Sequence, residues 1–137
     1  MTIVSDLPKT DNKEEIYLQV FKQVEALLDG ERDLIANMAN ISSVVHHAFN
    51  FWWTGFYLVR KNELVLGPFQ GPVACTRISK GKGVCGKAWE TKSIQIVPDV
   101  HEFEGHIACS SETNSEIVIP INIVFFIVIV VSIFAIR

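Results

Sequence analysis

The sequence predicts an α+β fold in which two N-terminal helices pack on one face of an antiparallel sheet. Three observations lead to it. Apolar residues recur at helical spacing over the first third of the chain, strand-like segments rich in aromatic and β-branched residues follow, and a short glycine-led helix interrupts these strands. Helices that precede antiparallel strands bury their apolar stripe against the sheet, which is the α+β arrangement.

Two amphipathic helices are expected before residue 50. The first begins near Lys13 and ends at Gly30, a residue that commonly follows a helix. The second extends from about Glu31 to Phe49 and carries an apolar residue at every third or fourth position. Residues 1–12 are polar and are expected to form a flexible lead-in to the domain.

The strands are expected to begin at Trp53. Residues 53–60 are aromatic and β-branched, residues 61–63 form a turn, and a return strand begins at Leu64. A short strand, a glycine-led helix, a strand, a long loop and a last strand then follow over residues 74–78, 81–92, 93–97, 98–114 and 115–121. A loop as long as this one in a small domain is usually functional.

Composition excludes several classes of protein. The 137 residues are enough for one domain with a real core, and the net charge of −3 leaves no basic excess for nucleic acid. No basic stretch followed by an apolar one opens the chain, so a cytoplasmic location is expected. The mean hydropathy of +0.29 is high for a soluble domain, because no charged residue interrupts the run from Ile117 to Ile136.

Three cysteines, Cys75, Cys85 and Cys109, are the main chemical signal. Their number is too small and too odd for a disulfide-stapled secreted protein. Cys85 is expected at the start of a helix, where the helix dipole favours a thiolate, and Cys109 falls in the long polar loop, where access is easy. Around one pocket, one thiol could attack and another could resolve the product as a disulfide. Three buried, inert side chains are the alternative.

A metal site is a competing interpretation. His101, His106 and Cys109 lie close in the sequence, and Cys85 could supply a fourth ligand. Their spacing matches no common zinc arrangement, so no bound metal is expected. The glycine-rich segment GKGVCG lacks the spacing of a phosphate-binding loop, so nucleotide binding is not expected either.

Aromatic residues of the first strand are further candidates. Strand alternation places Trp53 and Tyr57 on the same face, either as core residues or as the wall of a pocket for an apolar or sulfur-bearing ligand. Glu116 opens a strand that is otherwise apolar. It is either a solvated strand end or the partner of a ligand's ammonium group.

From Trp53 to Ile121 the chain closely resembles the free methionine-(R)-sulfoxide reductases, a family built on a single GAF domain. The matching segments are WTGFYL, ELVLGPFQGPVACTRI, GKGVCGKAWET, IVPDVHEFEGHIACSS and SEIVIPI. Both cysteine spacings fit, and so do the preceding helices, so that the resemblance covers roughly residues 14–121. The resemblance implies a GAF-like fold.

It also implies reduction of the R sulfoxide of free methionine. Cys109 would be the attacking thiolate and would form a sulfenic acid as methionine leaves. Cys85 or Cys75 would then condense with it to a disulfide, which a thioredoxin system driven by NADPH would reduce. The helix position favours Cys85 as the most acidic of the three thiols.

In the family pattern, Trp53 and Tyr57 would line the pocket around the sulfoxide, and Glu116 would contact the substrate amino group or the sulfoxide. No bound cofactor is implied. The implied partners are free methionine-(R)-sulfoxide and thioredoxin. Nucleic acid and membrane are not expected as partners, and a homodimer is compatible with the family.

The chain departs from the family after Ile121. The family continues into a strand with a D-I-D-S-like motif and a closing amphipathic helix, whereas this chain reads NIVFFIVIVVSIFAIR. The expected organisation is therefore a GAF domain over residues 13–121, incomplete at its C-terminal end, and a divergent apolar tail over residues 122–137.

Three interpretations of the tail compete. It replaces part of the lost strand, it anchors the chain in a membrane, or it is translated non-coding sequence, which is the favoured hypothesis. The aspartates of the missing D-I-D-S-like motif would help to bind and protonate the substrate. A GAF-type small-molecule binding module without catalysis is therefore the alternative function.

Overall fold

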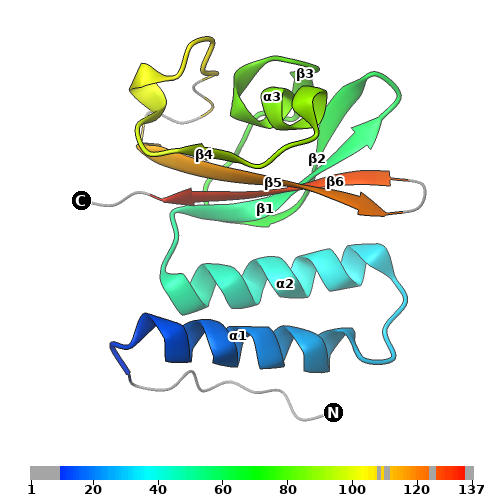
Figure 1. Cartoon of the computed structure of the whole chain (residues 1–137). Coiled ribbons are helices and arrows are strands. Elements are labelled where there is room, and N and C mark those ends of the chain that lie inside the picture. Colours follow the sequence, from blue (N-terminus) through cyan, green and yellow to red (C-terminus); the bar gives the residue numbers. More distant parts are fainter. Residues whose placement is uncertain (1–9, 108, 110–111, 124–125, 135–137) are drawn as a thin grey trace.

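The computed structural model describes residues 10–107, 109, 112–123 and 126–134. Two helices, α1 and α2, lie on one side of a six-stranded sheet, and the short helix α3 lies on the other side with the long loop (Figure 1). In chain order the elements are α1 (Lys13–Leu28), α2 (Leu34–Phe49), β1 (Trp53–Arg60), β2 (Glu63–Gln70), β3 (Arg77–Ser79), α3 (Gly83–Thr91), β4 (Gln95–Val97), the 3-10 helix η1 (Val100–Glu102), β5 (Ser115–Ile123) and β6 (Phe126–Phe134). The α+β prediction is confirmed.

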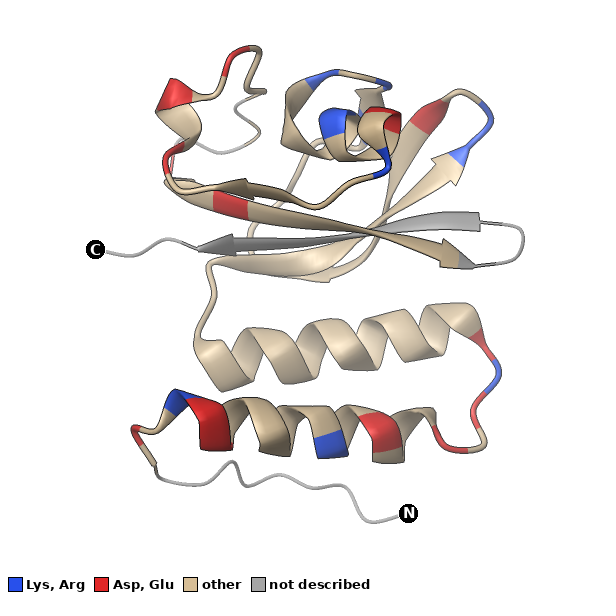
Figure 2. Cartoon of the chain, viewed as in Figure 1, with Lys and Arg blue, Asp and Glu red and all other residues tan. Residues whose placement is uncertain are grey.

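Helix α2 is the layer between α1 and the sheet. It contains no Lys, Arg, Asp or Glu, whereas α1 carries charges of both signs (Figure 2). It begins at Leu34, three residues later than expected, because the side chain of Asp33 accepts a hydrogen bond from the backbone N–H of Ala36 and caps the helix. Met38 is the centre of its buried face and packs against Phe56 and Leu58 of β1.

The sheet is antiparallel throughout, with the strand order β3-β2-β1-β6-β5-β4. Strand β6 therefore lies in the middle of the sheet, between β1 and β5, although it is formed by the apolar tail. Among the interpretations of the tail, the structure agrees with a strand over residues 126–134. None of the helices in the described part of the chain combines the length and apolar character that a membrane span needs.

Strand β2 begins one residue before the expected Leu64 and continues through Gly67 and Pro68 to Gln70. The pairing between β1 and β2 shifts register between Gly55 and Tyr57, and Pro68 lies at this irregularity. A proline has no backbone N–H to donate to the strand ladder. It is tolerated here because the irregularity interrupts the regular hydrogen-bond pattern. The following strand, β3, pairs only with the beginning of β2 and covers residues 77–79 rather than 74–78.

The larger core lies on the other face of the sheet, under α3. Val84, Ala88 and Trp89 of the helix are buried there against Leu64 of β2 and Val118 of β5. This packing fixes the start of α3 above the middle of the sheet, and the long loop then completes that face.

Candidate active site

A pocket of about 460 Å³, its open mouth included, lies on the sheet face that carries α3. Strands β1 and β5 form its floor, the start of α3 one wall, and the loop between η1 and β5 the other. The described lining residues are Trp53, Tyr57, Ala74, Ile78, Lys82, Gly83, Val84, Cys85, His106, Ile107, Cys109, Thr113 and Glu116. Of the six site residues predicted from the sequence, all but Cys75 are in this lining.

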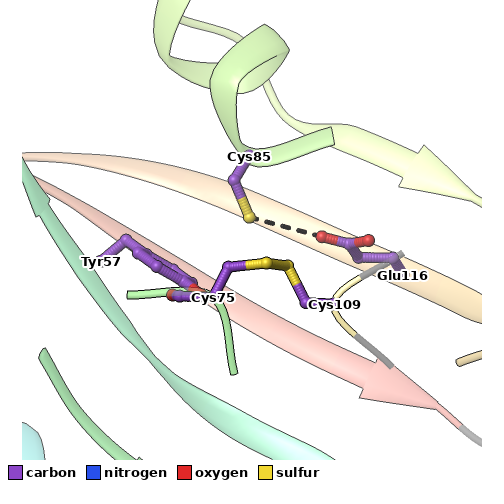
Figure 3. The surroundings of a disulfide bond; sticks show 5 residues. All are labelled: Tyr57, Cys75, Cys85, Cys109 and Glu116. Atoms are coloured by element: carbon purple, nitrogen blue, oxygen red, sulfur yellow. Dashed lines mark hydrogen bonds between the residues drawn. A yellow bond between two sulfur atoms is a disulfide. The ribbon is translucent and has the colours of Figure 1, made fainter. Parts of the chain in front are cut away.

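Cys75 and Cys109 form a disulfide beside the pocket (Figure 3). Their Cα atoms are 5.3 Å apart, although the residues are separated by 34 positions in the sequence. The bond joins the connection between β2 and β3 to the long loop. The hydroxyl of Tyr57 donates a hydrogen bond to the backbone carbonyl of Cys75 at 2.7 Å, so that β1 also holds this connection in place.

Cys85 is paired with Glu116 instead. Its thiol donates a hydrogen bond to Oε1 of Glu116 at 3.4 Å, from the first turn of α3 to the start of β5 (Figure 3). Both side chains are buried. The three cysteines therefore fall into two groups, a disulfide pair and a free thiol that contacts a carboxyl group.

The aromatic wall depends on a glycine. The ring of Trp53 stacks at 6.0 Å from Tyr57 and at 5.4 Å from Phe69, measured between ring centroids. A Cβ atom at Gly55 would lie 2.3 Å from the Cβ of Phe69 and 2.7 Å from the Trp53 ring. The indole can lie flat over β1 only because residue 55 has no side chain.

Two curated proteins are closely similar to the chain in sequence. GAF domain-containing protein A of Dictyostelium discoideum is 59% identical over 111 residues, which cover 80% of this chain and 70% of that protein. The free methionine-R-sulfoxide reductase of Saccharomyces cerevisiae is 51% identical over 118 residues, or 80% of this chain and 66% of the yeast protein. No protein-family model matches the chain.

The fold is similar to that of solved structures. The free methionine-R-sulfoxide reductase of Neisseria meningitidis, solved in complex with its substrate, superposes with a TM-score of 0.91 at 41% identity, over 97% of this chain and 81% of that one. This chain belongs to the free methionine-R-sulfoxide reductase family. The resemblance inferred from the sequence is confirmed, and so is the GAF fold. The chain spans only about two thirds of the length of its curated relatives.

Within this reductase fold, the expectation that the helix position makes the Cys85 thiol acidic is wrong. The residue does lie in the first turn of α3, but burial raises the pKa of the Cys85 thiol well above its usual range, and the neighbouring Glu116 raises it further. Loss of hydration and a nearby carboxylate both disfavour a thiolate, and here they outweigh the helix dipole.

Glu116 is the one carboxyl group among the described lining residues of the reductase pocket. Burial raises the pKa of Glu116 to about 7, and the hydrogen bond from Cys85 opposes this rise. Burial also raises the pKa of Tyr57, and Cys85 and Glu116 raise it further, so that Tyr57 remains a neutral donor. A carboxyl group with a pKa near 7 can act as an acid at neutral pH.

The competing metal interpretation gains no support from the reductase structure. His106 and Cys109 line the pocket, but Cys109 is bonded to Cys75, and Cys85 contacts Glu116. No cluster of three or more histidine, cysteine, aspartate or glutamate side chains in the described residues is arranged to hold a metal ion.

Sequence reasoning did not identify several lining residues of the reductase pocket, Lys82, Ile107 and Thr113 among them. Lys82 is the N-cap residue that directly precedes α3, within the glycine-rich segment GKGVCG. Ile107 packs within 3.3 Å of the position that a Cβ of Gly83 would occupy, so the long loop closes directly on the start of α3. The length of that loop was the available signal in the sequence, because a long loop in a small domain often contributes to a functional site.

Proposed function

We propose that this chain reduces the sulfoxide of free L-methionine-(R)-sulfoxide to methionine. The observation that carries the proposal is the Cys75–Cys109 disulfide at the edge of a pocket that also contains Trp53, Tyr57 and Glu116. Relatives that carry the reductase name, one of them solved with its substrate, support the same reaction.

Cys109 is the nucleophile in this proposal. It lines the pocket and forms a disulfide, whereas the Cys85 thiol is buried and has a raised pKa. The Cys109 thiolate attacks the sulfoxide sulfur, and the oxygen is transferred to Cys109, which becomes a sulfenic acid. The sulfoxide sulfur is thereby reduced by two electrons, and methionine leaves. The Cys75 thiol then attacks the sulfenic acid, forms the disulfide and releases water.

Glu116 supplies a proton to the sulfoxide oxygen. Its raised pKa leaves a protonated fraction at neutral pH, and its position in the lining directs it toward a bound ligand. Cys85 donates its hydrogen bond to one carboxyl oxygen and thereby leaves the other for the substrate. Trp53 and Tyr57 form the apolar wall for the methyl and thioether groups.

Each turnover leaves a disulfide that a dithiol must reduce. Thioredoxin, itself reduced with electrons from NADPH, is the reductant in the proposal, and no bound cofactor takes part. Since the cycle needs a continuous supply of reduced dithiols, it belongs in a reducing compartment such as the cytoplasm.

The test is methionine formation from each sulfoxide epimer, with dithiothreitol or with thioredoxin, thioredoxin reductase and NADPH. We expect turnover of the R epimer only. Cys109→Ser should lower the rate at least about a hundredfold. Cys75→Ser should keep dithiothreitol-driven turnover, because a small thiol can reduce the sulfenic acid directly, and should lose thioredoxin-driven turnover. Turnover that survives Cys109→Ser would contradict the proposed nucleophile.

One observation favours a second function, a binding module without catalysis. Among the described lining residues Glu116 is the only carboxylate, and the register position between Trp53 and Glu116 in β6 is Ile133. A pocket with one acid has less capacity to hold an ammonium group and to protonate an oxygen at the same time. Thermal stabilisation by methionine sulfoxide without methionine formation would support this alternative.

A further inference from the structure

A second, smaller hollow, called the outer hollow below, lies beside the disulfide and adjoins the substrate pocket, with which it shares Trp53, Ala74, Cys109 and Thr113. It encloses about 250 Å³ and is lined by Trp52, Trp53, Pro72, Val73, Ala74, Cys109 and Thr113. Cys109 thus lines both the substrate pocket and this outer hollow, whereas Cys75 is in neither lining among the described residues. Cys109 is therefore the member of the disulfide that both hollows share.

The rim of the outer hollow is apolar and exposed. Val73 has 86% of its surface exposed and Trp52 has 37%. The two chain segments that carry them, residues 50–59 and 64–76, contain no Asp, Glu, Lys or Arg. An exposed apolar side chain beside a reactive group is a common mark of a protein-binding surface.

The rim is also held in a fixed position. Gly71 adopts a φ of +117°, and a Cβ atom there would lie 2.5 Å from the carbonyl oxygen of Trp52. The connection that carries Val73 is therefore pressed against Trp52, and at its other end Cys75 is held by Tyr57 and by the disulfide. A surface that needs no rearrangement loses less entropy when a partner binds.

We propose that Trp52 and Val73 form the docking surface for a dithiol reductant protein, whose thiolate attacks Cys109 through the outer hollow. This proposal rests on the proposed function, in which each turnover leaves a disulfide that must be reduced. Among the described lining residues of the hollow, Cys109 with its disulfide is the redox-active group, and a thiolate is the nucleophile that reduces a disulfide. A small charged thiol would gain no binding energy from an uncharged apolar rim. A protein with apolar residues around its thiol would bury that rim when it binds.

The exchange balances without another reactant. The reductant thiolate forms a bond with Sγ of Cys109, the bond between Cys109 and Cys75 breaks, and the electron pair leaves on Cys75. The second thiol of the reductant then attacks its own half of the mixed disulfide and releases Cys109. The reductant loses two electrons and two protons and becomes a disulfide, and Cys75 and Cys109 become thiols.

The first experiment compares two reductants in the full chain, with thioredoxin as the protein probe and dithiothreitol as the small one. Val73→Asp should raise the KM for thioredoxin about tenfold or more, because binding would then desolvate a carboxylate. The rate with dithiothreitol should stay within a factor of about two. The matched control is Ile96→Asp, which also introduces an aspartate in place of an exposed β-branched residue. Ile96 is 70% exposed on the edge strand β4, and its substitution should alter neither the KM for thioredoxin nor the rate with dithiothreitol.

An unchanged KM for thioredoxin in Val73→Asp would overturn the docking surface. Loss of both rates would also overturn it, since Val73 would then act on the fold or on the substrate pocket. Efficient turnover with glutathione but not with thioredoxin would replace the protein partner by a small thiol.

The second experiment needs no methionine sulfoxide and therefore tests the docking surface even if the proposed function fails. A thioredoxin whose second cysteine is replaced by serine is mixed with the oxidised chain, and the trapped mixed disulfide is mapped by peptide mass spectrometry. We expect the bond at Cys109, and less trapping with Val73→Asp. A bond at Cys75 would overturn the assigned point of attack.

Discussion

At the scale of single residues, Glu116 is a buried carboxyl group in the lining of the pocket. It is only 7% exposed, and its one hydrogen bond in the described site comes from a thiol, which is a weak donor. A charged carboxylate is poorly solvated there, so the folded protein favours its neutral form. The same loss of solvation that makes Glu116 an acid near neutral pH makes the folded state less stable once the group ionises.

Glu116 should therefore make stability fall as pH rises. Its pKa rises from 4.5 to about 7 on folding, so its contribution is fully present below pH 4.5 and is lost as pH rises through about 7. Glu116→Gln removes this titration. We expect the stability of the unmodified protein, relative to Glu116→Gln, to fall by about 2 to 3 kcal/mol between pH 5 and pH 8, as measured by urea unfolding. A difference that is constant across this range would contradict the buried acid.

At the scale of elements, α2 connects the helical layer to the strand that carries the aromatic wall. Its face toward the sheet centres on Met38, which is 2% exposed and contacts Phe56 and Leu58 of β1. The alternate residues of the same strand, Trp53 and Tyr57, line the pocket on the other face. The position of β1, and with it the pocket wall, therefore depends on packing against α2.

Met38→Ala should destabilise the protein by about 2 to 5 kcal/mol, because it leaves a cavity between α2 and β1. Ile35→Ala is the matched control in the same helix, since Ile35 is 51% exposed, and it should change stability by less than about 1 kcal/mol. Chemical denaturation of both variants measures the difference. Equal effects of the two substitutions would mean that α2 does not rest on β1 in this way.

At the scale of the whole molecule, one covalent bond connects two parts of the site face. The disulfide closes a segment of 34 positions that contains β3, α3 and β4. It therefore restricts the unfolded chain over the whole outer layer of the pocket. The oxidation state of the site and the stability of the fold are coupled for this reason.

Oxidation of Cys75 and Cys109 should stabilise the protein by up to about 4 kcal/mol, the chain-entropy value for a loop of this length. Guanidinium unfolding with and without dithiothreitol measures the difference. Cys75→Ser should unfold like the reduced protein and should not respond to the reductant. If the unmodified protein also gives the same curve under both conditions, the disulfide does not constrain the unfolded state.

The elements themselves could be predicted because they depend on local patterns. The helices over 13–28 and 34–49 and the strands from Trp53 onward follow from apolar spacing and caps close to each residue. Errors occurred where a local signal competed with pairing, as at Pro68, which marks a bulge inside β2 rather than its end. The apolar tail gave no periodicity that could distinguish a central strand from the other interpretations.

The sequence by itself determined the α+β class, the family, and the set of six residues that come together beside α3. Only the tertiary structure decided how these residues combine: Cys75 with Cys109, Cys85 with Glu116, and β6 between β1 and β5. Local patterns define elements and residue types, but burial and pairing depend on segments far apart in the chain. The acidity of Cys85 illustrates the difference, since its helix position favours a thiolate and its burial beside Glu116 opposes one more strongly.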